Sequence, residues 1–259
     1  MNETDSSHSS LLRSVRVLFG LVESGQATTV TRLAQALDLP VSTTHRILNV
    51  LRQAGYVVQH EDTGSYGPGM DFLRICTMLA ASSPFTSSVQ AVLNGLVERS
   101  GESAFYGAYL KETGRMRFVS MLQSHHAIQY VLRGNTTYSL LWGASGRAMA
   151  ASLPEDQVRA IFEREKSSAE GVQVLPNWAT FWAILSEIRQ AGYALSDGQR
   201  HEGSHAIAAP VTGANDTLLG CVGLAMPDSR RQPEKTQQAV DLVRAAAAQL
   251  SMAGCFRQS

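Results

Sequence analysis

The sequence predicts an α+β protein with an N-terminal winged helix-turn-helix, a helical linker and a C-terminal domain built on an antiparallel sheet. Three patterns lead to this fold class. Residues 29–54 contain two short amphipathic segments joined by a turn, and residues 56–66 have the pattern of a β-hairpin. Strand-like and helix-like segments then alternate from residue 103 to residue 252. We expect a disordered tail over residues 1–10, the winged helix-turn-helix over 11–69, linker helices over 70–99 and the C-terminal domain over 100–259.

The first amphipathic segment is predicted to be a helix that Thr29 caps, because a hydroxyl at that position can accept a hydrogen bond from a free amide. Asp38 tolerates the turn that follows, and Pro40 ends that turn. Apolar residues share one face of this helix: Val30, Leu33, Ala34 and Leu37.

The second segment has the same periodicity and a polar opposite face. Its buried face is expected to hold Thr44, Ile47, Leu48 and Leu51. The opposite face, at about 100° per residue, holds Ser42, Arg46, Asn49 and Gln53. Arginine can pair with guanine, the side-chain amides can pair with adenine, and a hydroxyl near the helix start can bind a phosphate. The pattern therefore indicates a helix that reads DNA, although a solvated face in an ordinary helical bundle has the same pattern.

Two neighbouring patterns favour the DNA-reading interpretation. Apolar residues on a preceding helix would complete a three-helix core: Val15, Leu18, Phe19 and Val22. After Gly55, a short β-run at 56–59 and a turn at 62–64 predict the two-stranded wing of a winged helix. Together these segments predict a transcription regulator.

Charge and size indicate how the chain would hold double-stranded operator DNA. Between residues 11 and 60, five arginines stand against Glu23 and Asp38, a net charge of +3, whereas the whole chain is neutral. Continuing to residue 74 adds one arginine and three acidic residues, so the net charge falls to +1. Such a weak basic bias requires recognition by shape as well as by charge. Because one module is a small interface, we expect a homodimer or homotetramer with two modules on one operator.

Composition narrows the remaining possibilities. The chain has 259 residues, 44% hydrophobic and 17% charged, which is enough to form two buried cores. It has no apolar run long enough to span a membrane, and its Ser-rich start lacks the pattern of a signal peptide, so we expect a cytoplasmic protein without a membrane partner. Cys76, Cys221 and Cys255 are odd in number and widely spaced, which argues against a disulfide framework or a structural zinc site.

The remaining chain is expected to combine strands and helices around one sheet. Helical spacing predicts linker helices over 70–82 and 85–99. Strands are predicted over 103–110, 116–122, 192–196, 206–211 and 218–225. Helices are predicted over 144–151, from 154, over 179–190 and over 233–252. One face of the sheet is expected to stay open as a cleft for a small molecule.

The chain resembles the IclR family of bacterial regulators from residue 11 to residue 252. The resemblance rests on the segments RLAQALDLPVSTTHRILNVLRQAGYV, SYGPG, WGASGRAMAASLPE, GYALSDGQRHEGSHAIAAPV and GCVGLAMP. It implies a winged helix joined by a helical linker to a GAF-like effector domain, assembly as dimers or tetramers, and control of neighbouring genes by a bound metabolite. It also implies that the DNA-reading helix presents Ser42, Thr43, His45, Arg46 and Asn49.

The effector pocket is where this sequence departs from the family. Members that bind small carboxylates resemble one another in the loop matching Ala144, Ser145 and Gly146, which is kept here. Those members also have an acidic residue near the position of Ser196 and a cysteine at the position of Ala206. Two serines stand in them at the positions of Gly223 and Ala225. Losing those groups removes the partners of a buried carboxylate, whose desolvation is costly. The comparison with the family therefore implies an apolar or aromatic effector.

The predicted pocket has apolar walls and one polar group. The walls are expected to be Leu122, Tyr130, Leu132, Trp142, Val222 and Leu224, with His201 or His205 as the polar group. Each apolar residue has an alternative interpretation as plain sheet core. Family repressors of solvent and drug efflux pumps respond to apolar aromatics, so the resemblance implies control of an efflux-pump operon. The alternative is a catabolic operon controlled by a small carboxylic acid.

Residues 201–205 match the H-E-x-x-H pattern of zinc metalloproteases, so an enzyme has to be considered. That motif requires a helix, which places both imidazoles on one metal and lets the glutamate act as base. Here Gly203 and Ser204 weaken a helix, and a strand ending at Pro210 follows. We therefore expect a regulator that is not an enzyme and that uses no metal and no cofactor.

Overall fold

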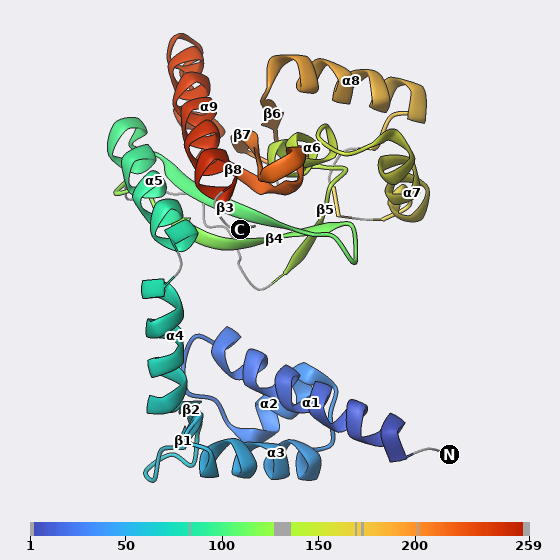
Figure 1. Cartoon of the computed structure of the whole chain (residues 1–259). Coiled ribbons are helices and arrows are strands. Elements are labelled where there is room, and N and C mark those ends of the chain that lie inside the picture. The colour runs from blue at the N-terminus through green and yellow to red at the C-terminus, as the bar shows by residue number, and fades with distance from the viewer. Residues whose placement is uncertain are drawn as a thin grey trace. The chain divides into compact units, whose positions relative to one another are not determined.

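The computed structural model of the chain divides into two compact units, residues 1–83 and 84–259 (Figure 1). It describes residues 3–82, 84–126, 136–168, 170–171, 174–200 and 202–255. The boundary between the units falls inside the segment predicted as a linker, so each of the two linker helices belongs to a different unit. Among the described residues, no helix combines the length and the apolar character that crossing a membrane requires.

Unit 1 is the predicted three-helix core with a two-stranded wing. Its elements are α1 (Glu3–Glu23), α2 (Val30–Leu37), α3 (Val41–Gln53), β1 (Val57–Gln59), β2 (Tyr66–Pro68) and α4 (Met70–Ser82). The hydroxyl of Thr29 accepts a hydrogen bond from the amide of Arg32 at 3.3 Å, so the predicted cap of α2 is present. The helix α1 begins at Glu3, inside the segment that was expected to be a disordered tail.

The core of unit 1 uses a different face of α1 from the one predicted. Val17 and Leu21 are buried, and together with Leu33, Leu48 and Tyr66 they belong to one cluster. The predicted positions Val15, Phe19 and Val22 are 44%, 58% and 43% exposed, and only Leu18 packs against the core. The prediction was wrong because α1 has apolar residues on two faces, and helical spacing alone does not say which face meets α2 and α3.

The end of α3 depends on a glycine. Gly55 has φ +77°, a left-handed conformation that strains any residue with a Cβ, and it lets the amide of Tyr56 donate to the carbonyl of Leu51 at 2.9 Å. A Cβ on Gly55 would also lie 2.2 Å from Oδ2 of Asp71, in the first turn of α4. The Asp71 side chain is half exposed and can rotate away, so the backbone conformation of Gly55 is the stronger constraint. The close approach of the two backbones is at Gly69, where a Cβ would lie 2.2 Å from the carbonyl oxygen of Gly55.

Unit 2 contains a six-stranded antiparallel sheet with the strand order β5-β4-β3-β8-β7-β6. Its strands are β3 (Ser103–Leu110), β4 (Arg115–Leu122), β5 (Thr137–Ser139), β6 (Ala194–Asp197), β7 (Ser204–Thr212) and β8 (Leu218–Pro227). Its helices are α5 (Pro84–Ser100), α6 (Gly143–Ala150), α7 (Glu155–Glu165), α8 (Trp178–Ala191) and α9 (Pro233–Cys255), with short 3₁₀ turns η1 (Ala214–Asp216) and η2 (Asp228–Arg230). The predicted α+β class is confirmed, and β5 is the one strand here that the sequence patterns did not predict.

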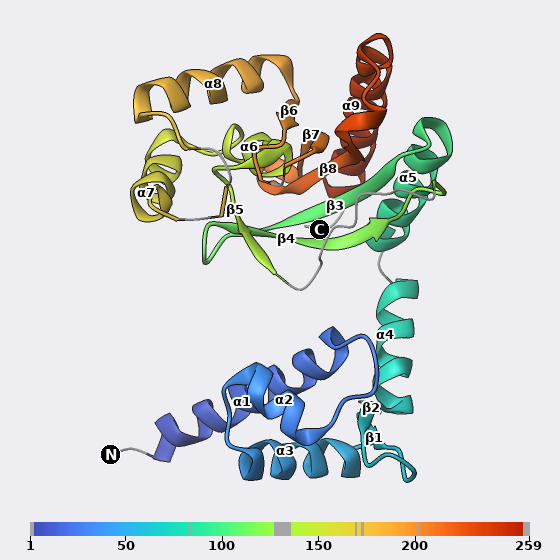
Figure 2. The ribbon, with the colours of Figure 1, turned by 180° about the vertical axis from the view of Figure 1, so that it is seen from behind.

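Helices cover both faces of this sheet, so the expected open face is absent from the described part of unit 2. One apolar cluster joins the sheet to α6, α7 and α8, and a second joins its other face to α5 and α9. Figures 1 and 2 show α5 and α9 side by side on their face of the sheet. We call these two sides the α6 face and the α9 face.

The fold predicts unequal effects for two glycine substitutions in unit 1. Gly55→Ala should lower stability by the roughly 1–2 kcal/mol that a left-handed conformation costs, plus the smaller cost of rotating the exposed Asp71 carboxylate away. Gly64→Ala is the matched control, since Gly64 has φ +64° but no atom within 4 Å of its Cβ position. Thermal unfolding followed by circular dichroism should show the larger decrease in Tm for Gly55→Ala. Equal decreases would contradict the close approach of α4.

Candidate functional site

The helix α3 presents a polar face on the surface of unit 1. Ser42, His45, Arg46 and Gln53 are exposed, and Thr43 and Asn49 are half-buried. The opposite side of the helix is buried through Thr44, Ile47 and Leu48, as the periodicity predicted. The hydroxyl of Thr44 donates to the carbonyl of Pro40 at 3.1 Å, which fixes the start of the helix.

Most side chains on this face are free to meet a ligand. Nδ2 of Asn49 lies 3.3 Å from Nδ1 of His45, so these two side chains form a pair one helical turn apart. The side chains of Ser42, Arg46 and Gln53 have no partner within the described residues. An arginine beside amide, imidazole and hydroxyl groups on one exposed helix is the residue set that reads base edges and phosphates in a major groove.

The structure adds Arg52 and Gln59, which sequence reasoning did not select as site residues. Arg52 Nη1 donates to Oε1 of Gln59 on β1 at 3.4 Å, and Nε2 of Gln59 donates to the carbonyl of Gly64 at 3.4 Å. These bonds tie the last turn of α3 to the wing. The turn of the wing contains Glu61 and Asp62, so its tip is acidic and poorly suited to phosphate. Only the position of Arg52 three residues after Asn49 could have signalled its place beside the polar face.

On the α6 face of unit 2, the predicted loop is the first turn of α6. Trp142 precedes the helix, and Ala144, Ser145 and Gly146 are all buried. Gly143 has φ +76°, and its amide donates to Oε1 of Gln199 at 3.2 Å. A Cβ on Gly146 would lie 2.9 Å from the carbonyl oxygens of Ser139 and Leu140. Glycine at these positions lets α6 start directly beneath the chain that follows β5.

Arg200 lies in the loop after β6 and donates hydrogen bonds to the chain that precedes α6. Its Nη2 donates to the carbonyl of Ser139 at 2.9 Å and to that of Trp142 at 2.6 Å, and its guanidinium lies 4.6 Å from the ring centre of Tyr138. Sequence reasoning missed Arg200 because its place depends on a long-range approach, and the only signal was its position four residues after Ser196. The structure therefore places a positive charge at the beginning of α6.

Two serines on this side of the sheet are buried residues whose hydroxyls have no protein partner within the described residues. Ser145 is 6% exposed and Ser196 is 5% exposed, and neither side chain has a hydrogen bond within the described residues. Since α6 packs against β6, both hydroxyls lie in the same region of unit 2. Neither oxygen is among the fully buried unpartnered atoms, so each hydroxyl remains accessible to water or to a ligand.

Burial also keeps the cysteine of this face unreactive. Cys221 lies in the cluster of the α6 face and is fully buried, and burial raises the pKa of its thiol to about 12, while a hydrogen bond with the backbone of Gly107 and the charge of Arg200 act in the opposite direction. A thiol with that pKa has almost no thiolate at neutral pH. Cys221 is therefore a core residue with no nucleophilic role.

Several residues predicted to line one effector pocket lie on the other face. Val222 and Leu224 are buried beneath α5 and α9, and Leu122 packs against the same cluster. His205 also lies on the α9 face, beside Ile207 and Met226. Because successive residues of a strand point to opposite sides, these four cannot share a cavity with Trp142 and the first turn of α6. Grouping them there was wrong, and Tyr130, Leu132 and His201 lie outside the described residues.

The H-E-x-x-H match does not form a helical metal site. Glu202 and Gly203 lie in a turn, and His205 lies on β7, so the required i, i+4 pairing on one helix is absent. Nδ1 of His205 is 2.5 Å from Oδ1 of Asp197, which also lies 3.2 Å from Nη1 of Arg231. The imidazole is therefore hydrogen-bonded to a carboxylate at the sheet edge, and that carboxylate also pairs with Arg231.

Comparisons with known proteins agree across the chain. Residues 10–61 match the IclR helix-turn-helix domain, and residues 79–252 match the bacterial transcriptional regulator IclR C-terminal family. Transcriptional repressor IclR of Escherichia coli K12 is 24% identical over 94% of this chain and 89% of its own length. The acetate operon repressor of Salmonella typhimurium LT2 is 23% identical with the same coverage.

Solved structures show the same fold. An IclR transcriptional regulator from Alicyclobacillus acidocaldarius superposes with a TM-score of 0.83 at 21% identity, covering 95% of this chain and 98% of the other. An IclR homologue from Microbacterium hydrocarbonoxydans, complexed with 4-hydroxybenzoate, gives a TM-score of 0.78 at 18% identity, covering 94% and 98%. The family and these relatives are transcriptional regulators and not enzymes.

The exposed face of α3 predicts the effect of removing one arginine. Arg46→Ala should weaken binding to the DNA upstream of the protein's own gene by roughly 5- to 150-fold, because a good arginine contact to a base gives about 1–3 kcal/mol. Arg244→Ala, an exposed arginine on α9, is the control for the loss of one charge. A gel-shift titration at one salt concentration measures both. Unchanged DNA binding by Arg46→Ala would refute the assigned face.

Proposed function

The chain belongs to the IclR family of bacterial transcriptional regulators, and we propose that it represses transcription as a homo-oligomer whose affinity for operator DNA changes when a small aromatic effector binds beside α6. The observation that supports the DNA part is the exposed polar face of α3. The observation that supports the effector part is the pair of unpartnered hydroxyls near a guanidinium at the start of α6. Repression is supported by the two curated relatives, both of which are repressors.

Aromatic side chains that contact one another extend from the sheet toward the start of α6. The ring centres of Phe105 and Phe118 are 5.1 Å apart, those of Phe118 and Tyr138 are 5.3 Å apart, and Arg200 lies over Tyr138. An aromatic ligand could extend such a series, because edge and offset contacts between rings are favourable. The relative from Microbacterium hydrocarbonoxydans, whose bound ligand is an aromatic acid, supports the same ligand class here.

The polar groups decide between two candidate effectors. Arg200 and the hydroxyls of Ser145 and Ser196 favour an aromatic acid, since a buried carboxylate needs a cation and hydrogen-bond donors. An aromatic acid suits a catabolic operon. The second candidate is a neutral aromatic that controls an efflux-pump operon, and it is favoured by the apolar residues Ala206 and Ala225 and by Gly223 on the sheet.

Effector binding would act on DNA binding through linkage. An effector shifts the DNA-bound equilibrium only by the difference between its affinities for the two states of the protein. Couplings of this kind are typically about 1–3 kcal/mol, which is roughly 5- to 150-fold in operator affinity. The proposal therefore requires a change of that size in a titration on DNA.

The two serines give a direct test of the effector site. Ser145→Ala and Ser196→Ala should fold normally, because neither hydroxyl bonds to the protein, yet each should weaken the response to 4-hydroxybenzoate or benzoate several-fold, as the loss of about 1 kcal/mol of hydrogen bonding predicts. Ser251→Ala is the control, since that hydroxyl bonds within the α9 face to Thr212 and Ala247. Gel shifts with increasing effector measure the response.

The choice of probe separates the two candidate effectors. Release of DNA by benzoate but not by toluene supports an aromatic acid, whereas the reverse result supports the neutral aromatic and the efflux-pump operon. No effect of either compound at saturating concentration would contradict an aromatic effector.

The exposed face of α1 supports assembly of two chains. Five apolar residues are exposed along this helix: Leu11, Leu12, Val15, Phe19 and Val22. A contiguous apolar surface of this kind usually marks an interface. A second copy of the chain is the occupant that the proposed operator binding requires, because each operator half-site needs its own α3.

A charge on this face should separate the subunits. Phe19→Glu is expected to shift the protein toward monomer and to weaken operator binding, because a carboxylate cannot be buried in an apolar interface without a partner. Gln35→Glu adds the same charge to the exposed side of α2 and should leave assembly unchanged. Sedimentation velocity measures the oligomeric state. An unchanged oligomer in Phe19→Glu would place the subunit interface elsewhere.

A further inference from the structure

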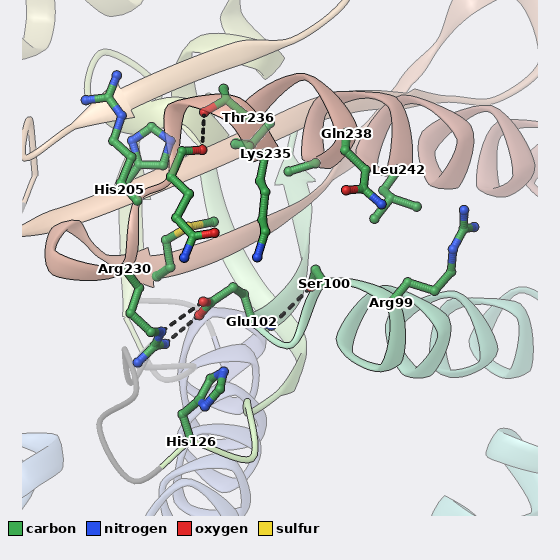
Figure 3. A pocket seen from close by; sticks show the side chains of 15 residues that line it. Arg99, Ser100, Glu102, His126, His205, Arg230, Lys235, Thr236, Gln238 and Leu242 are labelled. Atoms are coloured by element: carbon green, nitrogen blue, oxygen red, sulfur yellow. Dashed lines mark hydrogen bonds and ion pairs between the residues drawn. The ribbon is translucent and has the colours of Figure 1, made fainter.

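The α9 face contains a second pocket that has no part in the proposed effector site. It has a volume of about 380 Å³ and lies between the end of α5 and the first half of α9. Figure 3 shows Lys235 projecting from α9 into this space, with Arg99 on α5 and Glu102 just after α5. The volume falls within the range of small-molecule sites, roughly 300–1,000 Å³.

The side chains that line this pocket have more positive than negative charge. Arg230 donates to both carboxylate oxygens of Glu102 at 2.9 and 2.5 Å, and Arg231 lies 3.2 Å from Asp197. Arg99 and Lys235 have no carboxylate within 4.0 Å among the described residues. Two positive charges therefore remain available to a ligand.

The other walls favour an organic ligand. Ile207, Met226 and Leu242 line the pocket as buried residues of the α9-face core, so part of the surface is apolar. Lys235 and Glu234 lie in the first turn of α9, where the helix dipole favours negative charge.

We propose that this pocket binds a small organic anion, held by Arg99 and Lys235, at a site separate from the effector site beside α6. The sheet separates the two sites, since one lies on the α6 face and the other on the α9 face. The anion would bridge α5 and α9, the two helices that cover the α9 face.

The place of α5 in the chain suits an anion that bridges α5 and α9 to a regulatory role. It is the first element of unit 2 and begins at Pro84, directly after the last residue of unit 1. A ligand that contacts both α5 and α9 stabilises the conformation in which these helices are packed together. The pocket on the α9 face is therefore a second regulatory site, at which the anion acts independently of the effector beside α6.

Calorimetric titration of the full-length protein tests this site with succinate and with inorganic phosphate at constant ionic strength. We expect one molecule of anion per chain and at least about tenfold weaker binding in Arg99→Gln and Lys235→Gln, because each substitution removes a charged hydrogen-bond donor. Arg244→Gln, an exposed arginine farther along α9, is the control and should bind like wild type. Tighter binding of succinate than of phosphate would identify a carboxylate ligand, and the opposite order a phosphorylated one.

Three results would overturn the proposal. The first is no heat of binding for either anion at millimolar concentration. The second is an equal loss of affinity in Arg244→Gln, which would indicate attraction to the general surface charge. The third is a loss of anion binding in Ser145→Ala or Ser196→Ala, which would place the anion at the effector site. The serine variants also keep this result distinguishable from a failure of the proposed effector site.

Discussion

The alternation of side chains along β8 is the constraint on which the arrangement of unit 2 depends. This strand lies between β3 and β7, and it directs Cys221 and Ala225 to the α6 face but Val222 and Leu224 to the α9 face. A Cβ at Gly223 would lie 2.2 Å from the carbonyl oxygen of Ile207. Gly223 therefore lets β7 and the ring of Phe105 approach β8 closely, while the larger Val222 and Leu224 form the core under α5 and α9. A slip by one residue would exchange the two faces.

Periodicity predicted most of the helices and strands because each has a clear apolar repeat, and it predicted the exposed face of α3 for the same reason. It could not show which helix covers a given face, so Val222 and Leu224 were grouped with Trp142 although the sheet separates them. It also could not choose between the two apolar faces of α1. Arg200 was missed because a loop residue has no periodicity, and its partners lie about sixty residues earlier in the chain.

The two sides of the sheet differ in chemistry as well as in packing. Beside α6, aromatic rings, buried hydroxyls and one guanidinium surround the start of a short helix. Beside α9, ion pairs occupy the pocket between two long helices and leave a surplus of positive charge. Within the described residues of unit 2, Cys221 is held protonated by burial and His205 is paired with Asp197, so neither is set up as a nucleophile or a base. Unit 2 thus has the chemistry of recognition on both faces.

The acidic wing has a consequence for how such a protein finds its site. Each phosphate that a protein neutralises releases condensed counterions, and this release dominates binding to DNA of arbitrary sequence. Unit 1 has few basic side chains, Arg16 is already bonded to the carbonyl of Leu37, and Glu61 and Asp62 repel phosphate at the wing. We therefore expect brief contacts with random DNA and a search mainly by dissociation and rebinding, with little sliding along the duplex. Such a regulator would lose little of its free population to the rest of the chromosome.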